Sequence, residues 1–186
     1  MTNAQINDEL AREIKSERKI TNRIFKLIIL TEDRKLHLQR GFSSLHKWLV
    51  QEHKYSAPAA YRRIQAARLL RSVPSVESKI ESGAVNLTTL AQAQSMIRTQ
   101  EMNSKQKVSN KTKHEAVAKI VGLNSLDAEQ SLMDLLPENI SAVKRESVTV
   151  INSGTQRLST NLTNQAMADL QRAKELLAHT ILIIGC

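Results

Sequence analysis

Residues that start helices and residues that end them alternate between Gly41 and Pro137, and this alternation constrains the fold more than any other feature. Ser56 and Asn86 carry side-chain oxygens that can accept a hydrogen bond from a backbone N–H in a first helical turn. Gly83 can adopt the left-handed conformation that ends many helices, and a proline cannot continue one. The spacing of these signals predicts a succession of short helices.

Apolar residues at helical spacing lie between these signals. Only five glycines and three prolines occur among the 186 residues, which disfavours a β fold with many turns. Aromatic residues make up 3% of the chain, so the core should consist of Leu, Ile, Val and Ala. The expected helices are one or two within residues 6–40, then Leu45–Lys54, Ala57–Arg71, Val76–Ser82, Leu87–Gln100, one from the capping-box pair Thr112 and Glu115 to Gly122, and Leu126–Leu136.

The pattern changes after Pro137. Val148–Asn152 and Gln156–Thr163 are β-branched or alternating, with Gly154 between them, which predicts a hairpin or one strand after a loop. An amphipathic helix should follow from Asn164 to His179. We therefore expect a mainly α protein, with a multi-helix domain at residues 1–137 that contains a helix-turn-helix at about 44–71, a strand-and-helix appendage at 138–179, and an aberrant apolar tail at 180–186 that is either a truncation product or a short buried strand.

Positive charge is concentrated in one part of the chain. Residues 34–71 contain nine basic side chains and a single acidic one, Glu52, and so carry +8 of the total net charge of +9. A structural helix surface usually interleaves both signs at neighbouring positions. A concentrated excess of positive charge indicates a surface for a polyanion, with a solvated basic face as the alternative.

The most basic segment also has the outline of a helix-turn-helix. The predicted helices Leu45–Lys54 and Ala57–Arg71 are joined by a turn of about three residues. In such a motif the start of the second helix reads base edges, while flanking cations contact phosphates. The candidate DNA-binding residues are Lys47, Lys54, Ser56, Arg62, Arg63, Gln65, Arg68 and Arg71.

A helical wheel assigns different roles to these residues. Ala60, Ile64 and Ala67 form the expected buried stripe of the second helix, and Arg62 and Gln65 point nearly opposite to it. Arginine can pair with guanine and glutamine with adenine through two hydrogen bonds. The wheel therefore places base contacts at Arg62 and Gln65, and the remaining candidate cations beside phosphates.

The stretch GFSSLHKWLVQEHKYSAPAAYRRIQAARLLRSVPSVESKIESGAVNLTTLAQAQ resembles the helical region that precedes the nuclease domain of many bacterial HNH endonucleases. A weaker resemblance continues through RLSTNLTNQAMADLQRAKELLAH, so that it spans about residues 20–179. The first stretch is also distantly similar to the helix-turn-helix of ParB-type partition proteins. Both resemblances imply double-stranded DNA as the partner.

The chemistry of an HNH nuclease is missing from the sequence. That reaction needs clustered histidines around a divalent ion, whereas His37, His46, His53, His114 and His179 are scattered. No phosphate-binding glycine loop, G-x-S-x-G or H-E-x-x-H pattern occurs. The sequence therefore predicts no catalytic residue, no metal site, no cofactor and no small-molecule substrate.

The leading hypothesis is a non-catalytic DNA-binding module in the cytoplasm. The lone Cys186 excludes a disulfide framework, and no apolar run reaches the length of a membrane span. The alternative is an interaction protein that forms a homodimer, or docks a separate nuclease chain, through its C-terminal helix and tail. A divergent nuclease is the third hypothesis, which the histidine distribution disfavours.

Overall fold

Eight helices follow one another in the described part of the first of two compact units, Met1–Ile140. The structure is a computed structural model that describes residues 1–137, 147–152, 154–160 and 162–183. The helices are α1 (Asn3–Asp33), α2 (Leu36–Gln39), α3 (Leu45–Gln51), α4 (Ala57–Ser72), α5 (Val76–Ser82), α6 (Leu87–Ser104), α7 (Asn110–Lys119) and α8 (Ser125–Met133). The prediction of a mainly helical protein is confirmed.

Most helix ends lie where the sequence predicted them. Ser44, Ser56 and Asn86 are the N-cap residues of α3, α4 and α6, and each side chain accepts a hydrogen bond from the backbone N–H three residues later. Gly83 closes α5 with φ of 75°, in the left-handed region. These signals are local, because each needs only a few consecutive residues.

Several helix bounds differ from the prediction, and three of them change how the elements connect. The side chain that caps α7 is Ser109, whose hydroxyl accepts from the Thr112 N–H at 3.1 Å, so this helix starts earlier than a Thr112 cap would allow. Helix α6 continues to Ser104 and ends at Lys105 in a left-handed conformation. Helix α3 ends at Gln51, which lengthens the turn before α4 to five residues, Glu52–Ser56.

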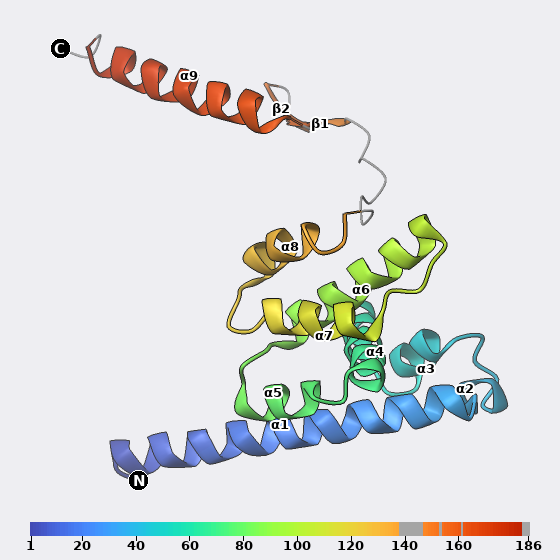
Figure 1. Ribbon diagram of the computed structural model, residues 1–186. Helices are drawn as coiled ribbons and strands as arrows, with labels where there is room; N and C mark the ends of the chain where they lie inside the picture. The colour runs from blue at the N-terminus through green and yellow to red at the C-terminus, as the bar shows by residue number, and fades with distance from the viewer. Residues whose placement is uncertain (138–146, 153, 161, 184–186) are drawn as a thin grey trace. The chain divides into compact units, whose positions relative to one another are not determined.

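Helix α4 is the central element of this unit. It packs against α1, α3, α5 and α6 (Figure 1). Ala60, Ile64 and Ala67 are buried as the wheel predicted. Four further residues of α4 are also buried, and they are Gln65, Ala66, Leu69 and Leu70. Most of the helix surface is therefore covered, and its first two turns are the more exposed part.

The core around α4 is mostly aliphatic, as the low aromatic content predicted, with Phe25 as its aromatic member among the buried residues. The large side chains with relative exposure below 2% include Phe25 from α1 and Leu69 from α4. Each such burial stabilises the fold by about 1.5–3 kcal/mol relative to an exposed side chain. Further members of this group are Leu90 and Ile97 of α6, Val117 of α7, Ile120 directly after α7, and Leu132 of α8.

Helix α1 runs along one side of the unit and packs against α5 (Figure 1). The Asn22 amide donates to the Glu77 carbonyl oxygen at 3.0 Å, and Lys26 pairs with the Glu77 carboxylate at 2.5 Å. Arg18 donates to the Ser82 carbonyl oxygen at 3.3 Å. Apart from half-buried Glu9, the residues before Arg18 are exposed, so only the second half of α1 belongs to the packed unit.

The second unit, Ser141–Cys186, contains a hairpin and a helix in its described residues. Strands β1 (Ser147–Asn152) and β2 (Thr155–Ser159) pair antiparallel, with an irregularity between Val150 and Asn152. Of the two predicted arrangements, the hairpin is the one found. Helix α9 (Asn164–Ile183) continues through most of the predicted tail, so the expectation of a short buried strand there is wrong. Residues 138–146 and 184–186 of the predicted appendage and tail lie outside the described residues.

Candidate nucleic-acid interface

The turn between α3 and α4 is fixed by hydrogen bonds from both sides. The Ser56 hydroxyl accepts from the Ala59 N–H at 3.4 Å and caps α4. The His46 Nε2 lies 3.0 Å from the Ala57 carbonyl oxygen. Since a carbonyl oxygen can only accept, Nε2 must carry the proton, which ties α3 to the first turn of α4. No local sequence signal predicts this role of His46.

The side chains of Lys54 and Arg63 are both oriented by contacts near this turn. Lys54 has φ of 57°, and its ammonium group donates to the Gln51 carbonyl oxygen at 2.7 Å. The Arg63 guanidinium lies 4.4 Å from the centre of the Tyr55 ring and donates to the Ala59 carbonyl oxygen at 3.3 Å. These contacts leave both charges without a carboxylate partner among the described residues.

Arg62 and Lys47 make none of the recorded ion pairs within the described residues. Arg62 is half-buried in the second turn of α4, and Lys47 is exposed in the first turn of α3. Both therefore retain donors for an external acceptor. Helices α3 and α4 pack against each other, so the two cations belong to one pair of neighbouring helices.

Gln65 is buried, and the expectation that it points outward is wrong. Its side chain is 2% exposed, and the amide oxygen has no hydrogen-bond partner among the described residues. The wheel assumed one buried stripe on α4, but this helix contacts four others and is buried on several sides. A residue at this position cannot reach a base edge without unpacking the helix.

Arg68 and Arg71 have carboxylate partners from α1, contrary to the expectation of an unneutralised basic helix. Arg68 pairs with Glu32 at 2.5 Å. Arg71 pairs with Glu32 at 3.1 Å and with Asp33 at 2.8 Å. The two acids immediately precede the basic segment in sequence, and the fold brings them to the C-terminal half of α4. These two acids, which lie just before residues 34–71, thus neutralise part of the positive charge of that segment.

The environment of Glu32 affects its protonation. Partial burial raises its pKa, but the hydrogen bond and charge of Arg68 and then those of Arg71 lower it more strongly. The net effect holds the pKa of Glu32 below its ordinary value of 4.5. The carboxylate is therefore charged at neutral pH, and it fixes both guanidinium groups in the protein.

A set of cations without ion pairs among the described residues remains between the end of α1 and the second turn of α4. We call this set the α2–α4 basic surface. Glu52 is the only acidic residue in the same segment, and it is exposed. The members of the surface are Arg34, Lys35, Arg40, Lys47, Lys54, Arg62 and Arg63.

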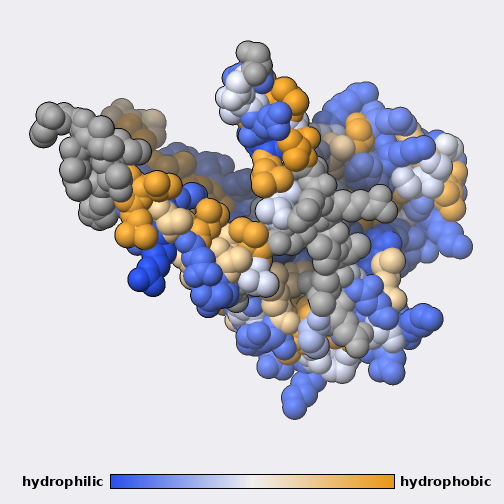
Figure 2. Space-filling model, turned by 90° about the horizontal axis from the view of Figure 1, so that it is seen from above, coloured by the Kyte–Doolittle hydropathy of each residue, from blue (hydrophilic) through white to orange (hydrophobic). Residues whose placement is uncertain are grey.

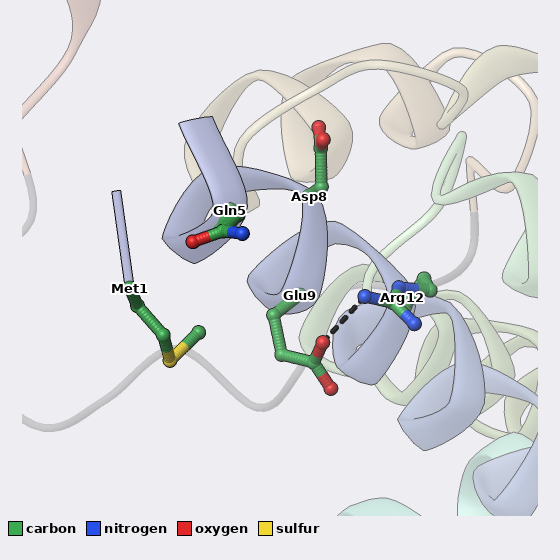
Figure 3. Close-up of a pocket in the computed structure, with 5 residues that line it drawn as sticks. All are labelled: Met1, Gln5, Asp8, Glu9 and Arg12. Atoms are coloured by element: carbon green, nitrogen blue, oxygen red, sulfur yellow. Dashed lines mark hydrogen bonds and ion pairs between the residues drawn. The ribbon is translucent and has the colours of Figure 1, made fainter. Parts of the chain in front are cut away.

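A hollow on the first turns of α1 was considered as an alternative site (Figure 3). Its one ion pair joins Arg12 to Glu9 at 2.5 Å, and these side chains are 71% and 47% exposed. Such exposed pairs contribute little to stability. The hollow is therefore an ordinary feature of an exposed helix, and it is lined by Met1, Gln5, Asp8, Glu9 and Arg12.

The described ranges hold neither a metal-ligand cluster nor a membrane-spanning helix. They contain no group of three or more His, Cys, Asp or Glu residues that could hold a metal ion. None of their helices combines the length and the apolar character that crossing a membrane requires.

The comparisons with known proteins do not identify a family. The resemblances to HNH endonucleases and to ParB-type proteins therefore stay predictions, and any function must be argued from the basic surface itself. No protein-family model, no curated protein and no solved structure matches this chain.

Proposed function

We propose that the unit Met1–Ile140 binds double-stranded DNA through the α2–α4 basic surface. The observation that supports this function is the charge that remains after internal ion pairs are counted. Arg68 and Arg71 have carboxylate partners, whereas the other seven cations of the segment share it with a single acidic residue, Glu52. DNA phosphates are the counter-ions that such a surface attracts most strongly.

The packing of α4 limits how DNA could approach. Because α1, α3, α5 and α6 cover most of this helix, only its first two turns are available to a groove. Residues at the start of a recognition helix are those that usually contact base edges. Arg62 is the candidate for a base contact, with Lys47, Lys54 and Arg63 as phosphate contacts.

We further propose that the unit binds DNA without cutting it. The scattered histidines and the lack of a ligand cluster in the described residues support a binding role over nuclease chemistry. Supercoiled plasmid incubated with the protein and magnesium or manganese should stay intact. Nicking that is abolished by one His→Ala change would instead indicate an active site.

Titration of labelled duplex DNA at low salt tests the binding function. The wild-type protein should bind, and the Arg62→Ala and Lys47→Ala variants should each bind more weakly. The exposed Lys111→Ala on α7 removes the same charge outside the surface and serves as the control. Equal affinities for all four proteins, or no binding at all, would exclude this function.

Protein–protein interaction through the second unit is a second candidate function. The described residues of this unit expose nine large apolar side chains, and Figure 2 shows hydrophobic side chains along α9. A two-stranded hairpin is at best marginally stable alone, which favours a partner for this unit. Sedimentation of the full chain tests self-association, since a homodimer would give twice the monomer mass. The exposed residues are Val148, Val150, Ile151, Leu158, Leu162, Met167, Leu170, Leu176 and Leu177.

A further inference from the structure

A hydrogen bond joins α4 to α6 beside the proposed DNA surface. The Tyr61 hydroxyl lies 3.2 Å from the Ser95 hydroxyl, and this links the second turn of α4 to the middle of α6. The Tyr61 side chain is nevertheless 43% exposed. The junction of the two helices at this point therefore lies at the protein surface and not in the core.

Each helix places an arginine next to this junction. Arg62 directly follows Tyr61, and Arg98 lies three residues after Ser95 on α6. Residues three apart share a helix face and are separated by about 4.5 Å along the axis, so Arg98 lies on the face of α6 that carries Ser95. Arg62 is turned by about 100° around α4 from Tyr61 and is therefore beside the junction and not directly over it.

The charge of Arg98 is not balanced within its helix. Arg98 is exposed, and no ion pair of this residue is recorded within the described ranges. The nearest carboxylate on α6 is Glu101, which is already paired with Lys107 and Lys113, each at 3.2 Å. Like Arg62, Arg98 thus keeps its hydrogen-bond donors for an external acceptor.

From this arrangement we propose that the DNA-binding surface crosses from α4 onto α6, and that Arg98 contacts a phosphate next to the nucleotides at Arg62. The inference rests on the proposed DNA-binding function. Arginine suits this role because its planar guanidinium presents several donors to phosphate oxygens. The Tyr61–Ser95 hydrogen bond joins the two helices at this point of the surface.

The salt dependence of duplex binding tests this role of Arg98. Arg98→Ala should weaken binding several-fold, and should make the slope of log K against log salt less negative by about 0.9, the value for one lost phosphate contact. Arg98→Lys keeps the charge and should restore most of the slope. Arg23→Ala removes an exposed arginine of α1 and should leave the slope unchanged. Equal melting temperatures would confirm that each variant is folded.

The outcomes separate this inference from the proposed function. If Lys47→Ala flattens the slope but Arg98→Ala matches the wild type, the extension to α6 is wrong and the α2–α4 basic surface stands alone. If Arg98→Ala and Arg23→Ala flatten the slope equally, the effect is one of net charge and the inference also fails. If the wild-type protein binds no duplex at low salt, the proposed function and the extension both fail.

Discussion

Glu32, in the last turn of α1, accepts two hydrogen bonds from Arg68 of α4, at 2.5 Å from Nη2 and at 3.0 Å from Nε. The same carboxylate pairs with Arg71 at 3.1 Å. One acid thus holds two of the arginines that the sequence had suggested for DNA phosphates. Glu32 and Arg68 are 36 positions apart in the chain. Their contact divides the basic segment into arginines that are paired within the fold and cations that have no ion pair among the described residues.

Removing the Glu32 carboxylate should destabilise the helical unit. Glu32→Gln is expected to lower the free energy of unfolding by about 1–2 kcal/mol, because a partly buried charge-assisted hydrogen bond is lost and two arginines lose their partner. Urea denaturation followed by circular dichroism measures this change. Glu13→Gln, on the exposed half of α1, is the control and should have little effect. Equal stability of both variants would show that the pair contributes nothing.

The same carboxylate predicts a pH dependence of stability. Because the pKa of Glu32 is lowered in the folded protein, its contribution is fully present above the ordinary value of 4.5 and is lost as the pH falls through the lowered pKa. Wild-type stability should therefore fall more steeply below about pH 4.5 than that of Glu32→Gln. Parallel curves for the two proteins between pH 5 and pH 2 would contradict the prediction.

Arg68 and Lys47 should differ in their effect on DNA binding. Lys47→Ala is expected to reduce the salt slope by about 0.9, because Lys47 is a proposed phosphate contact that is exposed and has no ion pair among the described residues. Arg68→Ala should leave the slope nearly unchanged, since its charge is already matched by Glu32, but should lower stability. Fluorescence titration from 50 to 300 mM salt distinguishes them. A flatter slope for Arg68→Ala would restore its assignment as a phosphate contact.

Gln65 should behave as a core residue. Gln65→Met conserves volume and should change the free energy of unfolding by less than about 1.5 kcal/mol. Gln65→Glu places a charge at a site that is 2% exposed, and should cost about 2–4 kcal/mol. Chemical denaturation of both variants gives these values. If Gln65→Glu were as stable as the wild type, the side chain would have to reach solvent.

Two glycines in the left-handed backbone conformation should each be destabilising to replace with alanine. Gly83 and Gly122 have φ of 75° and 73°, and alanine at either position should cost about 1–2 kcal/mol. A Cβ at Gly83 would also lie 2.5 Å from the Arg18 guanidinium, whereas nothing lies within 4 Å at Gly122. Because Arg18 can swing away, thermal denaturation should show costs within about 0.5 kcal/mol of each other. A much larger loss for Gly83→Ala would mean that Arg18 is held rigidly.

Local sequence determined the helices of this protein and most of their ends. A cap such as Ser56 or Asn86 acts on the N–H groups of the next turn, and Gly83 acts through its own φ angle. The wheel also found the apolar stripe Ala60, Ile64 and Ala67. These features depend on residues within a few positions of one another, so the sequence contains all that is needed to predict them.

The tertiary structure decided which polar side chains of α4 are buried or paired with a carboxylate and which are neither. Gln65 is buried because four helices surround α4, and no helical wheel of a single segment can show a second covered face. Arg68 and Arg71 are neutralised because the fold brings Glu32 and Asp33 to them from the end of α1. Charge pairing depends on distance in space and not on position in the chain. Only the packing of the helices therefore shows that Arg68 and Arg71 are paired with carboxylates, whereas Arg62 has no ion pair among the described residues.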